Sequence, residues 1–365
     1  MTTVLDRQAL NRATLARQHL LERRVAGTTA AEVVGHLGGL QAQEPREPYT
    51  GLWSRIAAFD PAPASAALTD RTLVRTLLMR RTVHLVTADD CLAHRALHQP
   101  MITQRTWGAR KADLAGVTPE TLAEAVAPCF TETPRTGGEV ARLVAARFPD
   151  AAHAALADAA VSVVPLVQVP PRGTWDGAGQ ARLTTVAAWL GRDPDPEPAA
   201  EELVRRYLRA FGPAASADLR AWCGLTGLPA VLARMRPELR TFRDERGREL
   251  LDVPDAPLPG PDVPAPVRFL PAFDNVVLGF DDRSRVIDDA HRGLSVAGAR
   301  FVLVDGRVAA TWAPSGGDGA DGTDLTVQPL RPLSPAETDD IVAEGERLRE
   351  FRGGGAPGRV RVATV

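Results

Sequence analysis

Apolar residues near the N-terminus follow a helical spacing that ends at a short polar segment. Four of them recur at the period of an α-helix: Val33, Val34, Leu37 and Leu40. Thr29 and Glu32 precede them with the spacing of a capping box, in which a hydroxyl and a carboxylate satisfy two N–H groups at a helix start. The pattern therefore predicts a helix over about residues 30–40 with one buried face.

Two glutamines follow that helix in a segment that we expect to be extended. Gly38-Gly39 weakens the helix, and Pro45 and Pro48 are incompatible with an ordinary helix further on. Residues i and i+2 of an extended chain point to the same face, so Gln41 and Gln43 would present two amides side by side. Such a pair can orient a water molecule, although neither amide is a strong base. A polar loop that bonds its own backbone explains the same pattern, and the segment alone favours that alternative.

The periodicity then changes from helical to strand-like. The apolar runs 73–79 and 82–86 are typical of two strands joined at Arg80 and Arg81. Several short helices that close on a β-hairpin have the order of a winged helix. This order recurs weakly twice more along the chain, which indicates tandem modules of one architecture.

The last hundred residues have a different pattern. Residues 268–279 and 299–312 are rich in strand formers, and Asp305-Gly306 is a strong signal for a two-residue hairpin turn. A Gly/Asp loop at 315–322 and a helix over 334–351 follow. We therefore predict an α+β fold of three tandem winged-helix modules and a β-rich C-terminal subdomain. The predicted boundaries are 1–115, 116–195, 196–262 and 263–365.

Composition excludes several classes of protein. The 365 residues are 44% hydrophobic and 24% charged, and no apolar run is long enough to span a membrane. The first residues do not resemble a signal peptide. Cys91, Cys129 and Cys223 are scattered singly, and the histidines lack ligand spacing. We therefore expect a cytoplasmic protein with no disulfide framework, no metal, no cofactor and no membrane partner.

Charge is unevenly distributed along the chain. Residues 1–111 hold 15 basic and 9 acidic residues, a net +6, whereas the remainder carries a net −8 and the whole chain −2. This asymmetry suggests an anionic partner near the N-terminal third. The pI near 6.4 argues against a strongly basic nucleic-acid binder of the usual kind. Arginine richness can equally arise from compositional bias of the genome.

Five segments carry a resemblance to a known family. They are Gln41-Ala-Gln43 and residues 75–86, 207–219, 270–284 and 304–308. In this order they resemble the AlkZ-type DNA glycosylases, a winged-helix family associated with resistance to azinomycin-like alkylating antibiotics. The resemblance covers nearly the whole chain. It implies three winged helices and a small β-barrel around a C-shaped channel that embraces DNA. Arg81 is a departure, because relatives often have glycine in that hairpin turn.

The resemblance also implies a reaction. A Gln–hydrophobic–Gln motif maps onto Gln41, Ala42 and Gln43, with the two glutamines as the catalytic residues. Alkylation at guanine N7 makes the base cationic, so the base leaves without a general acid. The sugar becomes oxocarbenium-like and needs a positioned water more than a strong base. The implied activity is monofunctional hydrolysis of N7-alkylguanine adducts in double-stranded DNA by a monomer. Interstrand crosslinks are further candidate substrates, and the implied role is self-resistance to a DNA-alkylating natural product.

Three other residues are candidate neighbours of that site. His84 alternates with apolar residues on the second hairpin strand, where a histidine is more often structural than catalytic. Asp274 and Arg283 both lie in the segment 270–284 of the resemblance. The simpler interpretation is a paired structural charge, and the functional alternative is contact with the damaged strand.

Three arginines are candidate DNA contacts. Arg80, Arg81 and Arg172 lie at predicted hairpin tips, where guanidinium groups can reach phosphates or a minor groove. Solvated tips without a partner explain the same positions equally well. Lys111 is the only lysine, so we expect the reaction to stop at the abasic site, because strand nicking needs an amine nucleophile.

Two other functions fit the pattern less well. Winged helices usually serve in DNA-binding transcriptional regulators, which dimerise and protect palindromic sites. A resistance protein that sequesters a drug would need a closed apolar pocket and no affinity for DNA.

Overall fold

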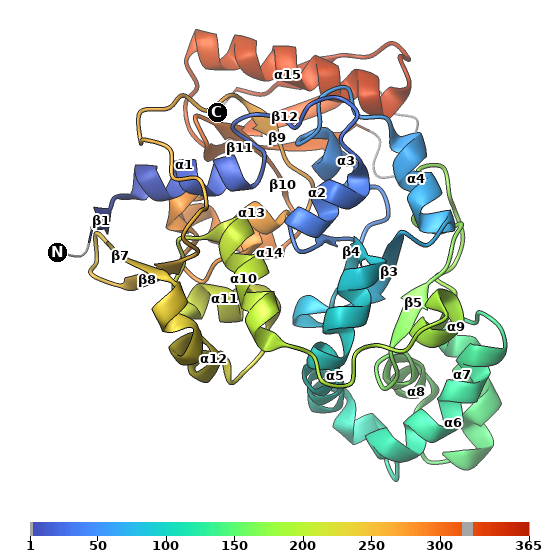
Figure 1. Cartoon of the computed structure of the whole chain (residues 1–365). Coiled ribbons are helices and arrows are strands. Elements are labelled where there is room, and N and C mark those ends of the chain that lie inside the picture. Colours follow the sequence, from blue (N-terminus) through green and yellow to red (C-terminus); the bar gives the residue numbers. More distant parts are fainter. Residues whose placement is uncertain (1–2, 316–323, 365) are drawn as a thin grey trace.

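The computed structural model describes residues 3–315 and 324–364, which form a mixed α+β fold with three sheets (Figure 1). The N-terminal part contains nine elements: β1 (Val4–Leu5), α1 (Arg7–Arg17), α2 (Ala30–His36), β2 (Leu40–Gln41), α3 (Glu47–Trp53), α4 (Pro61–Thr69), β3 (Leu73–Leu77), β4 (Val83–Thr87) and α5 (Ala88–Arg110). The capping box at Thr29 and Glu32 is present, and the four apolar residues of the predicted helical face are at most 4% exposed. The burial of these residues is therefore confirmed, but the helix is shorter than predicted, since α2 ends at His36 and Leu40 already belongs to β2.

The next segments alternate helices with short strands. Residues 119–190 form α6 (Pro119–Glu132), α7 (Gly137–Val144), α8 (His153–Ala160), β5 (Leu166–Gln168), β6 (Leu183–Thr185) and α9 (Val186–Leu190). Residues 200–252 form α10 (Ala200–Phe211), α11 (Ser216–Cys223), α12 (Leu228–Met235), β7 (Arg240–Asp244) and β8 (Glu249–Asp252).

A five-stranded antiparallel sheet lies at the centre of the molecule. Its strand order is β2-β4-β3-β5-β6, and the hairpin predicted at 73–86 forms its middle, with Leu77 opposite Val83. Arg75 of β3 lies opposite Gln168 of β5. Strands from the first two predicted modules therefore share one sheet. The module boundaries themselves remain a prediction.

The N-terminal segment lies beside residues that are distant in sequence. β1 pairs in parallel with β7 in the sheet β1-β7-β8, and Val4 is opposite Arg243. Helix α1 follows at the same side of the molecule (Figure 1), with Leu10 in one hydrophobic cluster with Phe242 and Leu250. The N-terminal segment thus stabilises the part of the chain that ends in β8.

The C-terminal region differs from the prediction in two ways. Its elements are β9 (Arg268–Phe269), α13 (Asn275–Leu278), α14 (Arg292–Val296), β10 (Arg300–Val304), β11 (Arg307–Pro314), β12 (Leu325–Pro329), α15 (Pro335–Gly353) and β13 (Val360–Val362). The sheet order is β13-β12-β11-β10-β9, so in the described part of the chain the sheet is open and the expected β-barrel is wrong. Residues 268–279 form only a short strand before α13, because the Asp274 side chain caps that helix by accepting from Val276 N–H at 2.8 Å.

The hairpin turn at Asp305-Gly306 is confirmed between β10 and β11, and both residues have positive φ. The predicted Gly/Asp loop at 315–322 falls almost wholly outside the described residues. The searched residues include no helix that is both long and apolar enough to cross a membrane.

Candidate active site

The strand β2 reaches the central sheet through two glycines with positive φ. Gly38 and Gly39 have φ values of +67° and +105°. A Cβ atom on Gly39 would lie 2.8 Å from Cγ1 of Val86 and 3.2 Å from the carbonyl oxygen of Leu85. Only glycine tolerates both the backbone conformation and the close approach, so this position fixes how β2 joins β4.

The predicted alternation of side chains along the motif is present as far as Ala42. Leu40 and Ala42 both belong to the hydrophobic cluster beneath α2, so Gln41 lies on the opposite face of the strand. Gln41 is opposite His84 in the ladder between β2 and β4, and its side chain is almost fully buried. Gln43 lies just beyond the strand and is exposed. Its Oε1 accepts a long hydrogen bond from the Val83 N–H at 3.4 Å. That both amides act on one face remains a prediction.

Arg80 holds the side chain of Gln41. Its Nη2 donates to Gln41 Oε1 at 2.9 Å and to Asn275 Oδ1 at 3.3 Å, while Nη1 donates to the Trp222 carbonyl. Burial, together with the positive charges of Arg283 and Arg105, lowers the pKa of Arg80 to about 10. The guanidinium remains cationic at neutral pH and faces only neutral acceptors.

Arg75 holds the backbone of the same motif. This residue of β3 is 2% exposed, and its Nη2 donates to the Ala42 carbonyl at 2.8 Å. Its Nε donates to Gln168 Oε1 at 3.2 Å. Burial lowers its pKa to about 10, with Arg172 adding to the effect. Within residues 3–315 and 324–364, neither Arg75 nor Arg80 has a carboxylate within ion-pair distance.

The other two candidate DNA contacts have partners within the protein. Arg81 donates from Nε to Thr106 Oγ1 at 2.8 Å and forms an ion pair with Asp158 at 2.6 Å. Arg172 is partly buried and donates from Nη1 to the Gly179 carbonyl at 2.9 Å. Arg80 and Arg81 have positive φ, which turns the side chains back toward the protein. The sequence had suggested that both arginines extend from the hairpin tip. In the structure they instead fold back against the protein.

His84 is fully buried beside the motif. Its Nδ1 lies 3.0 Å from the Thr82 carbonyl, and its Nε2 has no hydrogen-bond partner. Burial lowers the pKa of His84 to about 3, and the charge of Arg80 acts in the same direction. His84 is consequently neutral at physiological pH and supplies no cation to the site.

Asp274 and Arg283 do not form the pair that the sequence suggested. Asp274 instead forms a bidentate ion pair with Arg55, at 2.8 and 2.9 Å, and both side chains are completely buried. Arg283 donates from Nη1 to Ser295 Oγ at 2.6 Å. The correction follows from the fold, because α13 turns Asp274 toward α3 and away from Arg283.

Asn275 is a site residue that sequence reasoning missed. Its Oδ1 accepts from Arg80, and its Nδ2 donates to the Gly39 carbonyl at 3.1 Å. It therefore connects the C-terminal region directly to the residue before β2 and, through Arg80, to Gln41. The only sequence signal was its place within residues 270–284, which carry part of the family resemblance.

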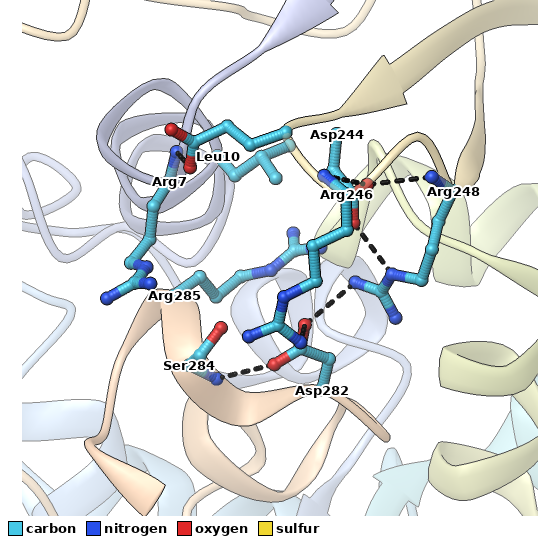
Figure 2. A pocket seen from close by; sticks show the side chains of 9 residues that line it. Arg7, Leu10, Asp244, Arg246, Arg248, Asp282, Ser284 and Arg285 are labelled. Carbon is cyan, nitrogen blue, oxygen red and sulfur yellow. Dashed lines mark hydrogen bonds and ion pairs between the residues drawn. The ribbon is translucent and has the colours of Figure 1, made fainter.

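A second charged site lies between α1, the β7–β8 hairpin and residues 282–285. Figure 2 shows this pocket of about 260 Å³. Arg248 forms ion pairs with Asp244 at 2.7 Å and with Asp282 at 3.0 Å, and Arg246 pairs with Asp282 at 3.2 Å. The buried Arg285 stacks on Phe280 at 4.1 Å. These contacts tie the hairpin to the loop, which is a structural role.

The described residues offer no group of three or more histidine, cysteine or carboxylate side chains that could hold a metal ion. The three cysteines are free thiols. At the glutamine motif, Arg80 donates to the Gln41 side chain and Arg75 to the Ala42 carbonyl.

Comparison with known proteins identifies the family to which this chain belongs. The family model described as "DNA glycosylase AlkZ-like" matches residues 34–351, so the chain belongs to the AlkZ-like DNA glycosylase family. The resemblance of the five segments is thereby confirmed.

A curated protein sequence and a solved structure, both from Streptomyces sahachiroi, are similar to this chain. The protein named "Interstrand DNA cross-link repair glycosylase" is 29% identical over 241 residues. That alignment spans 62% of this chain and 61% of the relative, which is less than two thirds of its length. The solved structure of the DNA glycosylase AlkZ covers all of both chains with a TM-score of 0.78 at 24% identity. This structural likeness shows a shared fold.

Proposed function

We propose that this protein is a monofunctional DNA glycosylase that hydrolyses the N-glycosidic bond of N7-alkylguanine adducts in double-stranded DNA. The observation that carries the proposal is the Gln41–Ala42–Gln43 motif. Arg80 fixes a side chain of the motif and Arg75 fixes its backbone. Membership of a DNA glycosylase family supports the same reaction.

The electrostatics of the site suit a base that is already a good leaving group. An N7-alkylated guanine carries a positive charge and departs without a proton donor. The buried His84 is neutral, and the amides do not titrate, so neither supplies an acid. The remaining task is to hold a water molecule against C1′ of the sugar, which positioned amides can do.

Interstrand crosslinks are a further proposed substrate, with self-resistance to a DNA-alkylating natural product as the biological role. A crosslinked guanine cannot be flipped freely into a pocket, because its tether holds the other strand. We therefore propose an open cleft in which Gln41 and Gln43 reach C1′ while the nucleotide stays in the duplex. The name of the 29% identical relative is consistent with this substrate.

We propose further that three winged-helix modules form a C-shaped channel around the DNA, and that the protein acts as a monomer. Phosphate contacts would come from arginines without a carboxylate partner near the motif. Within residues 3–315 and 324–364, Arg172, Arg105 and Arg283 have no carboxylate partner and donate to carbonyl or hydroxyl oxygens. Arg105 donates to the Arg80 carbonyl at 2.9 Å. An uncompensated guanidinium favours a phosphate, because the phosphate supplies the missing negative charge.

The reaction is proposed to end at the abasic site. Strand nicking by a glycosylase requires an amine that forms a Schiff base, normally a desolvated lysine. Lys111 is exposed in a 3₁₀ turn after α5 and contributes nothing to the motif.

The experiment that tests the function is incubation with duplex DNA that carries a defined N7-alkylguanine. We expect the free modified base and an intact abasic strand as products, with no release from undamaged DNA. Gln328→Ala, an exposed glutamine on β12, is the matched control for Gln41→Ala and Gln43→Ala. Protection of a specific palindrome without base release would indicate a regulator instead. Binding of the free drug without DNA affinity would indicate a sequestering protein.

A further inference from the structure

We propose that Arg80 is a positioning residue for Gln41 and that the two glutamines consequently have different roles. Gln41 presents its amide N–H groups as hydrogen-bond donors, whereas the Gln43 oxygen accepts a hydrogen bond from the attacking water, which gives up its proton to solvent as the C1′–oxygen bond forms and the bond to the base breaks. This inference rests on the proposed function, because both roles refer to hydrolysis at C1′.

The orientation of the Gln41 amide follows from the chemistry of its partner. An arginine side chain has only donors, so the group that faces Arg80 Nη2 at 2.9 Å must be the amide oxygen. The amide nitrogen is therefore turned away from Arg80. Because Gln41 is almost fully buried, few other orientations are open to it. Gln41 is thus fixed as a hydrogen-bond donor toward whatever binds beside the strand.

Arg80 is itself held by three distant segments. The Trp222 carbonyl at the end of α11 and the Asn275 side chain of α13 both accept from it. Arg105 of α5 donates to its backbone carbonyl. Gly224 leaves room for the Arg105 side chain, because a Cβ atom there would lie 3.1 Å from Nη2 of Arg105. The guanidinium is therefore a rigid anchor and differs from the mobile hairpin-tip group that the sequence suggested.

Gln43 lacks such an anchor. Its side chain is exposed, and the 3.4 Å contact from the Val83 N–H is long for a hydrogen bond. Its oxygen can therefore accept from a water molecule at little cost, and the amide can adjust when DNA binds. The division of roles follows from one fixed amide and one adjustable amide in the same motif.

This arrangement predicts unequal effects of a carboxylate at the two positions. Gln41→Glu would place a carboxylate against Arg80 and form an ion pair, while the N–H donor is lost. Gln43→Glu would keep an acceptor where one is required. We expect Gln43→Glu to retain measurable excision and Gln41→Glu to lose at least as much as Gln41→Ala.

A double-mutant cycle tests the positioning role. Arg80→Met removes the guanidinium but keeps an unbranched apolar stem, and it should lower single-turnover excision of an N7-alkylguanine by about 10²-fold with DNA affinity nearly unchanged. In the Gln41→Ala background, Arg80→Met should lower the rate of single-turnover excision by less than about 3-fold, because Arg80 acts through Gln41. Arg349→Met is the matched control, since Arg349 is a buried arginine of α15 that contacts Glu346 and the Ala356 carbonyl.

A readout other than activity separates positioning from folding. The side-chain NH₂ resonances of Gln41, assigned by their absence in Gln41→Ala, should shift and broaden in Arg80→Met while the remaining amide spectrum is retained. If Arg80→Met does not fold, the Gln41→Glu and Gln43→Glu pair tests the same division of roles without changing Arg80.

The outcomes distinguish this inference from the proposed function. Equal losses from Arg80→Met in both backgrounds, or equal excision by the two glutamate variants, would overturn the inference alone. Absence of base release by the unmodified protein from every adduct would overturn the proposed function. A loss of DNA affinity that matches the loss of excision would assign Arg80 to phosphate binding instead.

Discussion

Two arginine-rich regions of this protein use the same side chain in different ways. In the pocket of Figure 2, Arg246 and Arg248 share the carboxylate of Asp282, and Asp244 supplies a second one. Beside the glutamine motif, Arg75 and Arg80 donate only to carbonyl and amide oxygens. Arg246 and Arg248 of the first region are paired with carboxylates, whereas Arg75 and Arg80 of the second have no carboxylate partner among the described residues.

The difference shows why net charge along the sequence was an incomplete guide. Much of the excess positive charge of residues 1–111 is neutralised by acidic residues far along the chain, as in Arg17–Asp252, Arg55–Asp274 and Arg81–Asp158. Among the described residues, Arg75 and Arg80 beside Gln41 have no carboxylate within ion-pair distance, and neither has the buried Arg95 of α5, which donates to Gln99 Oε1 and to the Val164 carbonyl. Burial of an unpaired charge costs free energy, so its retention next to two amides favours a functional explanation.

The largest expected effect that tests this comparison is on the salt dependence of DNA binding. Neutralisation of phosphates releases counterions, so affinity should fall by several orders of magnitude if many contacts form. Arg283→Met should reduce the slope of log affinity against log salt by about 0.9, the value for one phosphate contact. The measurement is a fluorescence anisotropy titration at several salt concentrations.

Arg248→Met is the control for that measurement, because its guanidinium is already paired with two carboxylates. Its slope should match that of the unmodified protein. If the unmodified protein, Arg283→Met and Arg248→Met all show the same salt dependence of DNA affinity, arginines with and without a carboxylate partner do not differ in DNA binding.

A smaller effect is expected on stability when the compensated region is broken. Asp282→Ala removes the partner of Arg246 and Arg248 and the acceptor of the Ser284 N–H. Because one cap and two partly exposed pairs are lost, the free energy of unfolding should fall by about 1–3 kcal/mol. Urea denaturation gives the value. Excision by the folded variant should be unchanged, and a loss of excision without a loss of stability would contradict the structural role of this pocket.

The smallest expected effect concerns pH. Burial lowers the pKa of His98 from 6.5 to about 3, so between these values the unfolded chain binds a proton that the folded chain does not. Stability should therefore decrease as the pH falls below about 6.5, with a slope of at most about 1.4 kcal/mol per pH unit for this residue. His98→Leu should flatten the slope, as measured by urea denaturation from pH 8 to pH 4. An identical slope in the variant would show that His98 is protonated in the folded protein.

Local features of this fold could be read from the sequence. The capping box at Thr29, the hairpin over 73–86 and the turn at Asp305-Gly306 all formed as predicted. Each depends on residues within a few positions of one another, where backbone sterics and side-chain caps leave few alternatives. The glutamine motif was also visible, but only through its resemblance to a family.

Only the tertiary structure decided the partners of the charged residues. Asp274 pairs with Arg55 across 219 positions of sequence, and Arg80 meets Gln41, Trp222 and Asn275 from three separate segments. The chain has 43 basic and 45 acidic residues, so composition allows very many pairings. The backbone path selects among them, because an ion pair or a hydrogen bond forms only where packing brings two groups within a few ångströms. The sequence by itself determined that two glutamines flank Ala42. The fold decided that Gln41, and not Gln43, is held by Arg80.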